Sequence, residues 1–433
     1  LDARDFAVSL ARAQRGAVLQ QQLQQKHGGE NHPCAELAAV EADARFRRGD
    51  LAGSLQAAER ALGCARPGSR AEARALFCSG FGLAMFRGPE KVDAFMQRLL
   101  HSQPEPEAMP LIGTALCSVL VLNVQTGRRD MADACLRRSQ ELVAGADALD
   151  AVTLAWADLT RGTHHFYVER DMWGYLSCAE SALQRYQRAR LGWLPFGRIA
   201  VILACTYLGL YERAEQESRA IPADMPRNGP ELLLVRNARA IALLNMGRLD
   251  EAAAFTEILQ TDAAKNAFVR ASSTLLLTEI AWHRGDHAAA EAGLDAVADE
   301  LDADPFWTMA MGTLRARLRL SQGRPAEALP FCEAALAHSR RLGITSNHRH
   351  ALLLLIHAEV HHALGHGEQA RAAIREARDD LLRRAARIPA GEHEVRRAFF
   401  EAWPEHRRTL LLAREWLGER EVIGADASGV SPY

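Results

Sequence analysis

The sequence predicts an all-α solenoid of about nine helix-turn-helix units, and three observations lead to this fold class. Gly247, Gly285 and Gly323 stand 38 residues apart, within the similar phrases MGRLDEA, RGDHAAA and QGRPAEA. A helix-length apolar segment precedes each glycine, and an alanine follows five positions after it. A turn repeated at one interval means that one supersecondary unit is repeated.

Further glycines extend this period toward both ends. The series is Gly49, Gly88, Gly127, Gly209, Gly247, Gly285, Gly323 and Gly365. Its members are 38 to 42 residues apart, except that one glycine is missing between Gly127 and Gly209. Residues 169–183 keep the outline of a unit in that gap, so we count about nine units.

Each unit is expected to contain two helices joined by a tight turn. Segments 232–246 and 271–284 are long enough for about four helical turns. The following glycine ends the first helix in a left-handed conformation. An aspartate then precedes the second helix at Asp50, Asp250 and Asp286, where its carboxylate can cap free amides. Small residues let the second helix pack closely; they are Ala214, Ala252, Ala290, Ala328 and Ala370. Neither helix buries its apolar face alone, so the units must stack.

The period divides the chain into four parts. Residues 1–34 are expected to form an N-terminal helix, over 5–25, and a junction at Gly28-Gly29. The solenoid covers 35–386. Residues 387–418 are expected to form a capping pair of helices, over 392–403 and 405–417, and 419–433 a disordered tail. Because the chain begins with Leu1, we also expect it to be a piece of a longer protein.

Charge and cysteine content limit the expected partners and location. The chain has 52 basic and 54 acidic residues, so no overall field favours nucleic acid or an anionic membrane. The eight cysteines show no C-x-x-C spacing and are expected to be buried thiols, as in a reducing compartment. Cys135 and Cys332 in particular fall at packing positions of second helices. With no signal peptide and no uninterrupted apolar run of membrane-spanning length, we expect a cytoplasmic location and no membrane partner.

The sequence holds no set of residues that predicts catalysis. There is no phosphate-binding G-x-x-x-x-G-K-[ST] loop and no protein-kinase motif. His357 and His361 have the i, i+4 spacing of a helical metal pair, but HAEVH is not H-E-x-x-H, so its general base is not in place. We therefore predict no metal, no cofactor and no enzymatic activity in this chain.

Helix pairs with glycine at the turn and alanine five residues later resemble the tetratricopeptide repeat, although units of 38 to 42 residues exceed the usual length of about 34. The resemblance implies a right-handed superhelix whose first helices line the concave side. Such stretched repeats are similar to the C-terminal region of large bacterial kinase or ATPase signalling regulators. Residues 387–418, with an R-x-x-F step and a P-E step, resemble the closing segment of those proteins. This implies a sensor or scaffold region without its catalytic partner.

The same resemblance places a set of polar and aromatic side chains toward the concave groove. These candidate binding residues are Asn237, Asn245, Glu279, Trp282, His283, Arg317, Glu359 and His362. An aromatic section further toward the N-terminus comprises Trp156, Phe166, Tyr167 and Tyr207. The alternative for Trp282, Phe166 and Tyr207 is core packing between units.

The favoured function is that of a non-catalytic sensor or scaffold that binds a protein or peptide segment in the concave groove. Two alternatives stay open: sensing of a small inducer molecule, and self-association, as a homodimer, to space other domains. Departures from the regular period, around 155–180 and 346–366, are where adaptation to a partner is expected.

Overall fold

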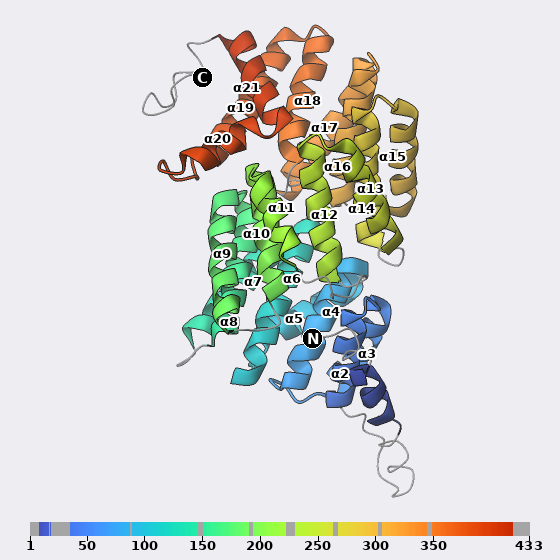
Figure 1. The fold of residues 1–433 in the computed structure, drawn as a ribbon, viewed down its shortest axis with the longest axis vertical. Coiled ribbons are helices and arrows are strands. Elements are labelled where there is room, and N and C mark those ends of the chain that lie inside the picture. Colours follow the sequence, from blue (N-terminus) through green and yellow to red (C-terminus); the bar gives the residue numbers. More distant parts are fainter. Residues whose placement is uncertain are drawn as a thin grey trace, which may run out of the picture.

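The computed structural model describes residues 8–16, 18, 35–86, 89–145, 150–189, 194–221, 230–262, 267–301, 305–343 and 349–418. In these ranges all regular secondary structure is helical. Nine helix pairs and one terminal pair wind into a right-handed superhelix, with the first pairs at one end and α18 to α21 at the other (Figure 1). The predicted fold class is therefore confirmed.

The first helices of the nine units are α2 (Ala35–Arg47), α4 (Arg70–Phe86), α6 (Met109–Gln125), α8 (Ala151–His164), α10 (Leu194–Leu208), α12 (Pro230–Asn245), α14 (Ala267–His283), α16 (Pro305–Ser321) and α18 (Arg349–Ala363). The second helices are α3 (Leu51–Cys64), α5 (Pro89–His101), α7 (Arg129–Ala144), α9 (Met172–Ala189), α11 (Tyr211–Arg219), α13 (Leu249–Asp262), α15 (His287–Leu301), α17 (Pro325–Leu342) and α19 (Gly367–Ala385). The short η1 (Pro106–Ala108) leads into α6, and the π-helix η2 (His165–Glu169) follows α8. The terminal pair consists of α20 (His393–Glu401) and α21 (Pro404–Leu417).

The turns behave as the period predicts. Every described glycine of the series has a positive φ, between 71° and 80°. The five alanines that follow are at most 2% exposed, which allows close contact between the two helices of a unit. Asp50 and Asp286 cap α3 and α15 through Gly53 N and Ala289 N, both at 3.0 Å. Asp250 instead lies within the first turn of α13 and pairs with Arg284 at 2.5 Å. Cys135 and Cys332 are fully buried, as predicted.

The unit without its glycine has a different turn. Helix α8 widens into η2, and Arg170 takes the left-handed conformation with φ of 57°. Among the described residues Arg170 is the only one other than glycine with a positive φ. The arginine therefore occupies a backbone conformation that glycine adopts elsewhere, which requires support from its surroundings.

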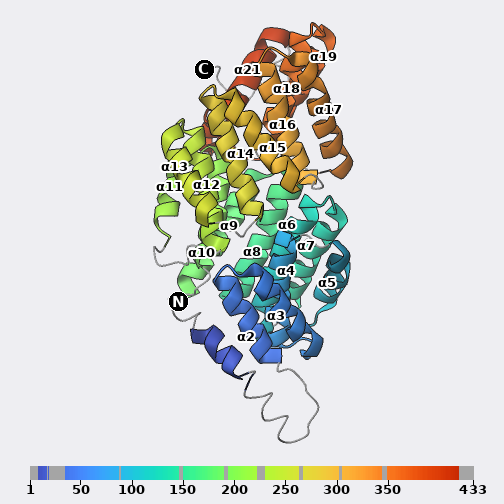
Figure 2. The ribbon, with the colours of Figure 1, turned by 90° about the vertical axis from the view of Figure 1, so that its right-hand side faces the viewer.

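Successive turns of the superhelix touch one another. Helix α4 of unit 2 contacts α14 of unit 7, and the Gly127 turn of unit 3 lies against Leu342 at the end of α17 in unit 8 (Figure 2). Arg170 of unit 4 pairs with Asp380 of unit 9, and α10 of unit 5 contacts α20 of the terminal pair. Each contact joins a unit to the one five further along, so one superhelical turn takes about five units.

One segment, Pro106–Val124, has the length and mean hydropathy of a membrane-crossing helix, and 56% of it is buried inside the fold. It comprises η1 and nearly all of α6, which packs between α4, α7 and α8 as a core helix does. Most of 1–34 lies outside the described residues, and so does the whole of the predicted tail, 419–433. In the first of these ranges, the helical stretch 8–16 packs with Gly16 against Leu37.

Candidate functional site: the C-terminal pocket

A cavity opens where α14, α16 and α18, the first helices of the last three units, face α21. Its volume is about 570 Å³. We call it the C-terminal pocket. It is lined by Trp282 of α14, by Arg317, Leu320 and Ser321 of α16, by Leu352, Leu355, Ile356, Glu359 and His362 of α18, and by Pro404, Glu405, Arg408, Leu412, Glu415 and Trp416 of α21.

Arg317 and Trp282 form one wall of the C-terminal pocket. The guanidinium carbon lies 3.5 Å from the centre of the indole ring, close enough for a cation–π interaction. The indole Nε1 donates to Ser321 Oγ at 3.2 Å, which holds the ring in place. Burial lowers the pKa of Arg317 to about 10, although Glu405 and Glu359 oppose this shift. The guanidinium is thus a cation in a poorly solvated place.

The opposite wall belongs to α21. Arg408 Nε donates to Glu359 Oε1 at 3.0 Å, which ties α21 to α18. His362 stacks on Trp416, with ring centres 4.4 Å apart and an angle of 12° between the planes. Between these polar contacts lie the buried side chains of Leu352, Leu355 and Leu412. The site therefore has an apolar floor and a charged rim.

The structure brings together four of the predicted concave residues: Trp282, Arg317, Glu359 and His362. Sequence reasoning missed the six contributors from α21, because the period treats 387–418 only as a cover. The sequence signal for them was the presence of charged and aromatic residues in a segment interpreted only as a cover: Glu405, Arg408, Glu415 and Trp416.

The remaining polar candidates lie outside the C-terminal pocket. Asn237 accepts a hydrogen bond from Ser272 Oγ at 2.9 Å, which links α12 to α14. Asn245 donates to Ile241 O of its own helix at 2.9 Å. Glu279 is 4% exposed and lies behind Arg317, and His283 is exposed with its ring edge-on to Trp282.

The aromatic section is a correction to the predicted groove. Trp156, Phe166 and Tyr207 are 2%, 3% and 7% exposed and belong to the core, so the alternative of core packing holds for Phe166 and Tyr207. Tyr167 is half-buried and packs edge-on against Phe166 at 4.6 Å. Tyr207 also stacks with Trp403 beside the terminal pair. For Trp282, by contrast, the ring lines the pocket.

A second group of charged residues surrounds η2, and we call it the η2 junction: His164, His165, Glu169, Arg170 and Asp171, with Asp380 and Arg387. Arg387 Nη1 lies 3.2 Å from Glu169 Oε2 and 3.4 Å from Asp171 Oδ2. Arg170 Nη1 lies 2.8 Å from Asp380 Oδ1, and Asp380 is 2% exposed. Burial raises the pKa of Asp380, but Arg170 and Arg384 outweigh that effect and hold it below its ordinary value.

Among the described residues, the side chains that most resemble a metal site also belong to the η2 junction. Ligand atoms of His165, Glu169 and Asp171 all lie within 4.8 Å of one another. The guanidinium of Arg387 already pairs with both carboxylates, so a cation of the chain itself neutralises this cluster. On α18, His357 Nε2 and His361 Nε2 are 3.1 Å apart, and His361 Nδ1 is 3.3 Å from Nδ1 of His366 in the turn before α19.

Comparisons with known proteins identify the fold and leave the family open. No protein-family model matches the sequence, and no curated protein sequence matches it. A solved Rap protein complexed with Competence and Sporulation Factor aligns with a TM-score of 0.53 at 11% identity, over 80% of this chain and 99% of that one. A human IFIT1 dimer with PPP-AAAA gives 0.48 at 11%, over 94% of each chain, and yeast Tom70 gives 0.38 at 11%, over 98% and 96%. The alignment with the Rap protein agrees with the fold described above, a solenoid of tetratricopeptide-like helical repeats.

Proposed function

We propose that this chain is a non-catalytic scaffold that binds a peptide segment in the C-terminal pocket. The observation that carries the proposal is the convergence of four concave residues and α21 on one cavity of about 570 Å³. An apolar floor with a few charged groups at the rim is the usual composition of a recognition site. The one hydroxyl of the lining, Ser321, donates to Leu318 O at 2.8 Å and accepts from Trp282, as expected of a structural rather than a nucleophilic side chain.

The charges of the C-terminal pocket favour a peptide over a purely apolar ligand. Its rim carries Arg317 and Arg408 against Glu359, Glu405 and Glu415, so both signs of charge face the cavity. A peptide offers charges of both signs together with apolar side chains. The solved complex of a Rap protein with Competence and Sporulation Factor is an example of a similar fold with a bound factor.

We further propose that the chain is the repeat region of a larger signalling protein. The segment that resembles the end of bacterial kinase or ATPase regulators, 387–418, forms α20 and α21. Helix α21 is a wall of the C-terminal pocket and also packs on α18 and α19. A ligand in the pocket would therefore touch α21, the last helix of the described residues, from which occupancy can be relayed.

Affinity selection from a library of short random peptides tests the peptide-binding function. The bait is the wild-type chain, a Ser321→Trp variant that fills the C-terminal pocket, or an Ala337→Trp variant that adds the same side chain at an exposed site of α17. We expect the wild type and Ala337→Trp to enrich common sequences that Ser321→Trp does not retain. Equal enrichment on all three baits, or none on the wild type, contradicts the proposal.

A small molecule is the second candidate, because a volume of about 570 Å³ lies in the range of small-ligand pockets. The same three baits distinguish it when they are incubated with a mixture of metabolites. Retention of a metabolite on the wild type and Ala337→Trp, together with no peptide enrichment, would replace the peptide by a small ligand.

A further inference from the structure

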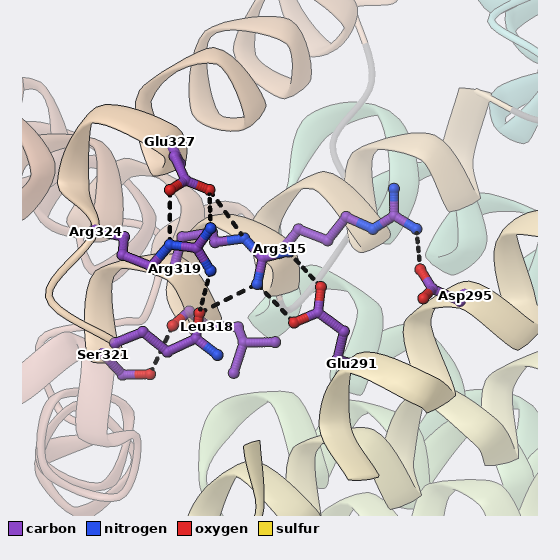
Figure 3. A network of polar contacts seen from close by, with 9 residues as sticks. Glu291, Asp295, Arg315, Leu318, Arg319, Ser321, Arg324 and Glu327 are labelled. Atoms are coloured by element: carbon purple, nitrogen blue, oxygen red, sulfur yellow. Dashed lines mark hydrogen bonds and ion pairs between the residues drawn. The ribbon is translucent and has the colours of Figure 1, made fainter. Parts of the chain in front are cut away.

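Three arginines on α16 sit at alternate positions, and their surroundings differ. Arg315 and Arg319 are four residues apart and therefore share one helix face. Figure 3 shows both reaching carboxylates of α15: Arg315 pairs with Asp295 at 2.9 Å, and Arg319 Nη1 donates to Glu291 Oε2 at 2.6 Å. Arg317 lies between them in sequence and projects to the other side of the helix, into the C-terminal pocket.

The guanidinium of Arg317 has no hydrogen bond to any described residue. Its nearest carboxylate oxygen is Glu279 Oε1, 3.7 Å from Nη1, which is within the distance of an ion pair but too far for a hydrogen bond. Its side chain is 18% exposed, and one flat face is covered by Trp282. A guanidinium carries five N–H donors in a planar fork, so its unused donors are directed toward the cavity.

Burial without a hydrogen-bonded anion disfavours the charged form of an arginine, as the lowered pKa of Arg317 reflects. An anion that enters the C-terminal pocket would supply the missing acceptors. We propose that Arg317, stacked on Trp282, is the anchor for a carboxylate of the ligand, with an apolar group next to that carboxylate lying over Leu355 and Leu412. This rests on the proposed function, because it names the chemical group that the same pocket recognises.

The charge of the rim selects a carboxylate over a phosphate. Glu359, Glu405 and Glu415 oppose Arg317 and Arg408, so the acidic and arginine side chains of the lining sum to one negative charge. A carboxylate carries one negative charge and matches the guanidinium fork with two parallel hydrogen bonds. A phosphate monoester carries about −1.5 to −2 at neutral pH and is repelled more strongly by the same glutamates.

Titration with 4-phenylbutyrate, a carboxylate on an apolar body, tests the anchor directly. Binding is followed through the arginine side-chain ¹H–¹⁵Nε resonances of the wild-type chain, with 4-phenylbutyramide as the neutral probe and phenyl phosphate as the dianionic one. We expect the carboxylate to shift the Arg317 resonance and to bind about tenfold or more tightly than either other probe. The Arg317→Gln variant should weaken carboxylate binding by about tenfold or more, whereas Arg319→Gln should change it by less than about twofold.

The outcomes separate this inference from the proposed function. Equal binding of the carboxylate and its amide, or unchanged binding by a folded Arg317→Gln variant, overturns the anchor even where peptides are enriched. Carboxylate binding at Arg317 without peptide enrichment overturns the peptide and keeps the anchor. For an enriched peptide, two changes identify the carboxylate that Arg317 binds: amidation of the peptide C-terminus, and replacement of its Asp and Glu residues by Asn and Gln. If neither change lowers the affinity, the proposal is also contradicted.

Discussion

The η2 junction and the C-terminal pocket both contain arginines close to carboxylates, yet their charges are balanced differently. At the η2 junction Arg170 and Arg387 lie 2.8 to 3.4 Å from carboxylate oxygens, and these ion pairs connect one superhelical turn to the next. In the C-terminal pocket Arg317 has no hydrogen bond to a described residue and faces a cavity. The comparison shows that the arginines of the η2 junction are paired with carboxylates across the fold, whereas Arg317 has donors directed into a cavity.

The largest effect should come from the buried acid of the η2 junction. Asp380→Ala leaves Arg170 and Arg384 without their buried carboxylate, so we expect the free energy of unfolding to fall by about 3–5 kcal/mol in urea titrations at neutral pH. Asp379→Ala, next to it and 41% exposed, should cost less than about 1 kcal/mol. Because the pKa of Asp380 is lower in the folded chain, its stabilisation is present above the unfolded pKa and is lost as pH falls through the folded value. Similar losses for both variants would mean that the buried Asp380 contributes no more to stability than its exposed neighbour Asp379.

Two glycine variants test whether a contact between successive superhelical turns adds to the loss of stability that a side chain causes at the turn of a helix pair. Gly247→Ala places a side chain at φ of 75° with no atom within 4 Å of the new Cβ, and should cost about 1–2 kcal/mol. Gly209→Ala has the same conformational strain, and its Cβ would also lie 2.6 Å from Ala402 Cβ and 2.7 Å from Ala398 O. We expect a total loss of about 2–4 kcal/mol from thermal and urea unfolding. Equal losses at both sites would mean that the terminal pair does not hold this contact in solution.

Stability measurements on α16 compare Arg319, which is hydrogen-bonded to a carboxylate, with Arg317, which is not. Arg319→Met removes the partner of Glu291 and should lower the free energy of unfolding by about 1 kcal/mol. Arg317→Met exchanges a cation without a hydrogen bond for an apolar side chain, but it also removes the ion-pair partner of Glu279, so we expect the free energy of unfolding to change by less than about 1 kcal/mol. If Arg317→Met were the more damaging of the two, Arg317 would be a structural residue like its neighbours.

The smallest expected loss of stability is for replacement of Arg387, at the exposed rim of the η2 junction. Arg387 is 42% exposed, and Arg387→Met should lower the free energy of unfolding by about 0.5–1 kcal/mol. Since the pairs with Glu169 and Asp171 are partly solvated, the loss should shrink in about 1 M salt. Arg387→Lys, which keeps the charge, serves as the control. A loss that is independent of salt would assign Arg387 a packing role instead.

The repeat period predicted the units and part of the site for one physical reason. Equivalent positions in stacked units lie on the same side of a solenoid, so a single register places Trp282, Arg317 and Glu359 toward one groove. The missing glycine between Gly127 and Gly209 likewise marked the irregular turn that the structure shows at η2. These features depend on contacts within a unit or between neighbours.

The features that the sequence did not predict depend on packing that the repeat period does not describe. Tyr207 is covered by Trp403 of the terminal pair, and the C-terminal pocket is closed by α21. The repeat length gives neither the superhelical pitch nor the position of the terminal pair, so neither contact follows from the period. Trp156, Phe166 and Tyr207, expected in the groove, are core residues because aromatic side chains of units 4 and 5 pack on one another there.

The most direct measurement of the central claim is a crystal structure of this chain with a peptide enriched on the wild type. We expect peptide density between α18 and α21, with a carboxylate oxygen about 2.7–2.9 Å from the Arg317 guanidinium, which remains stacked on Trp282. A peptide bound on the outer helices, or one in the C-terminal pocket that leaves Arg317 without an anionic partner, would contradict it.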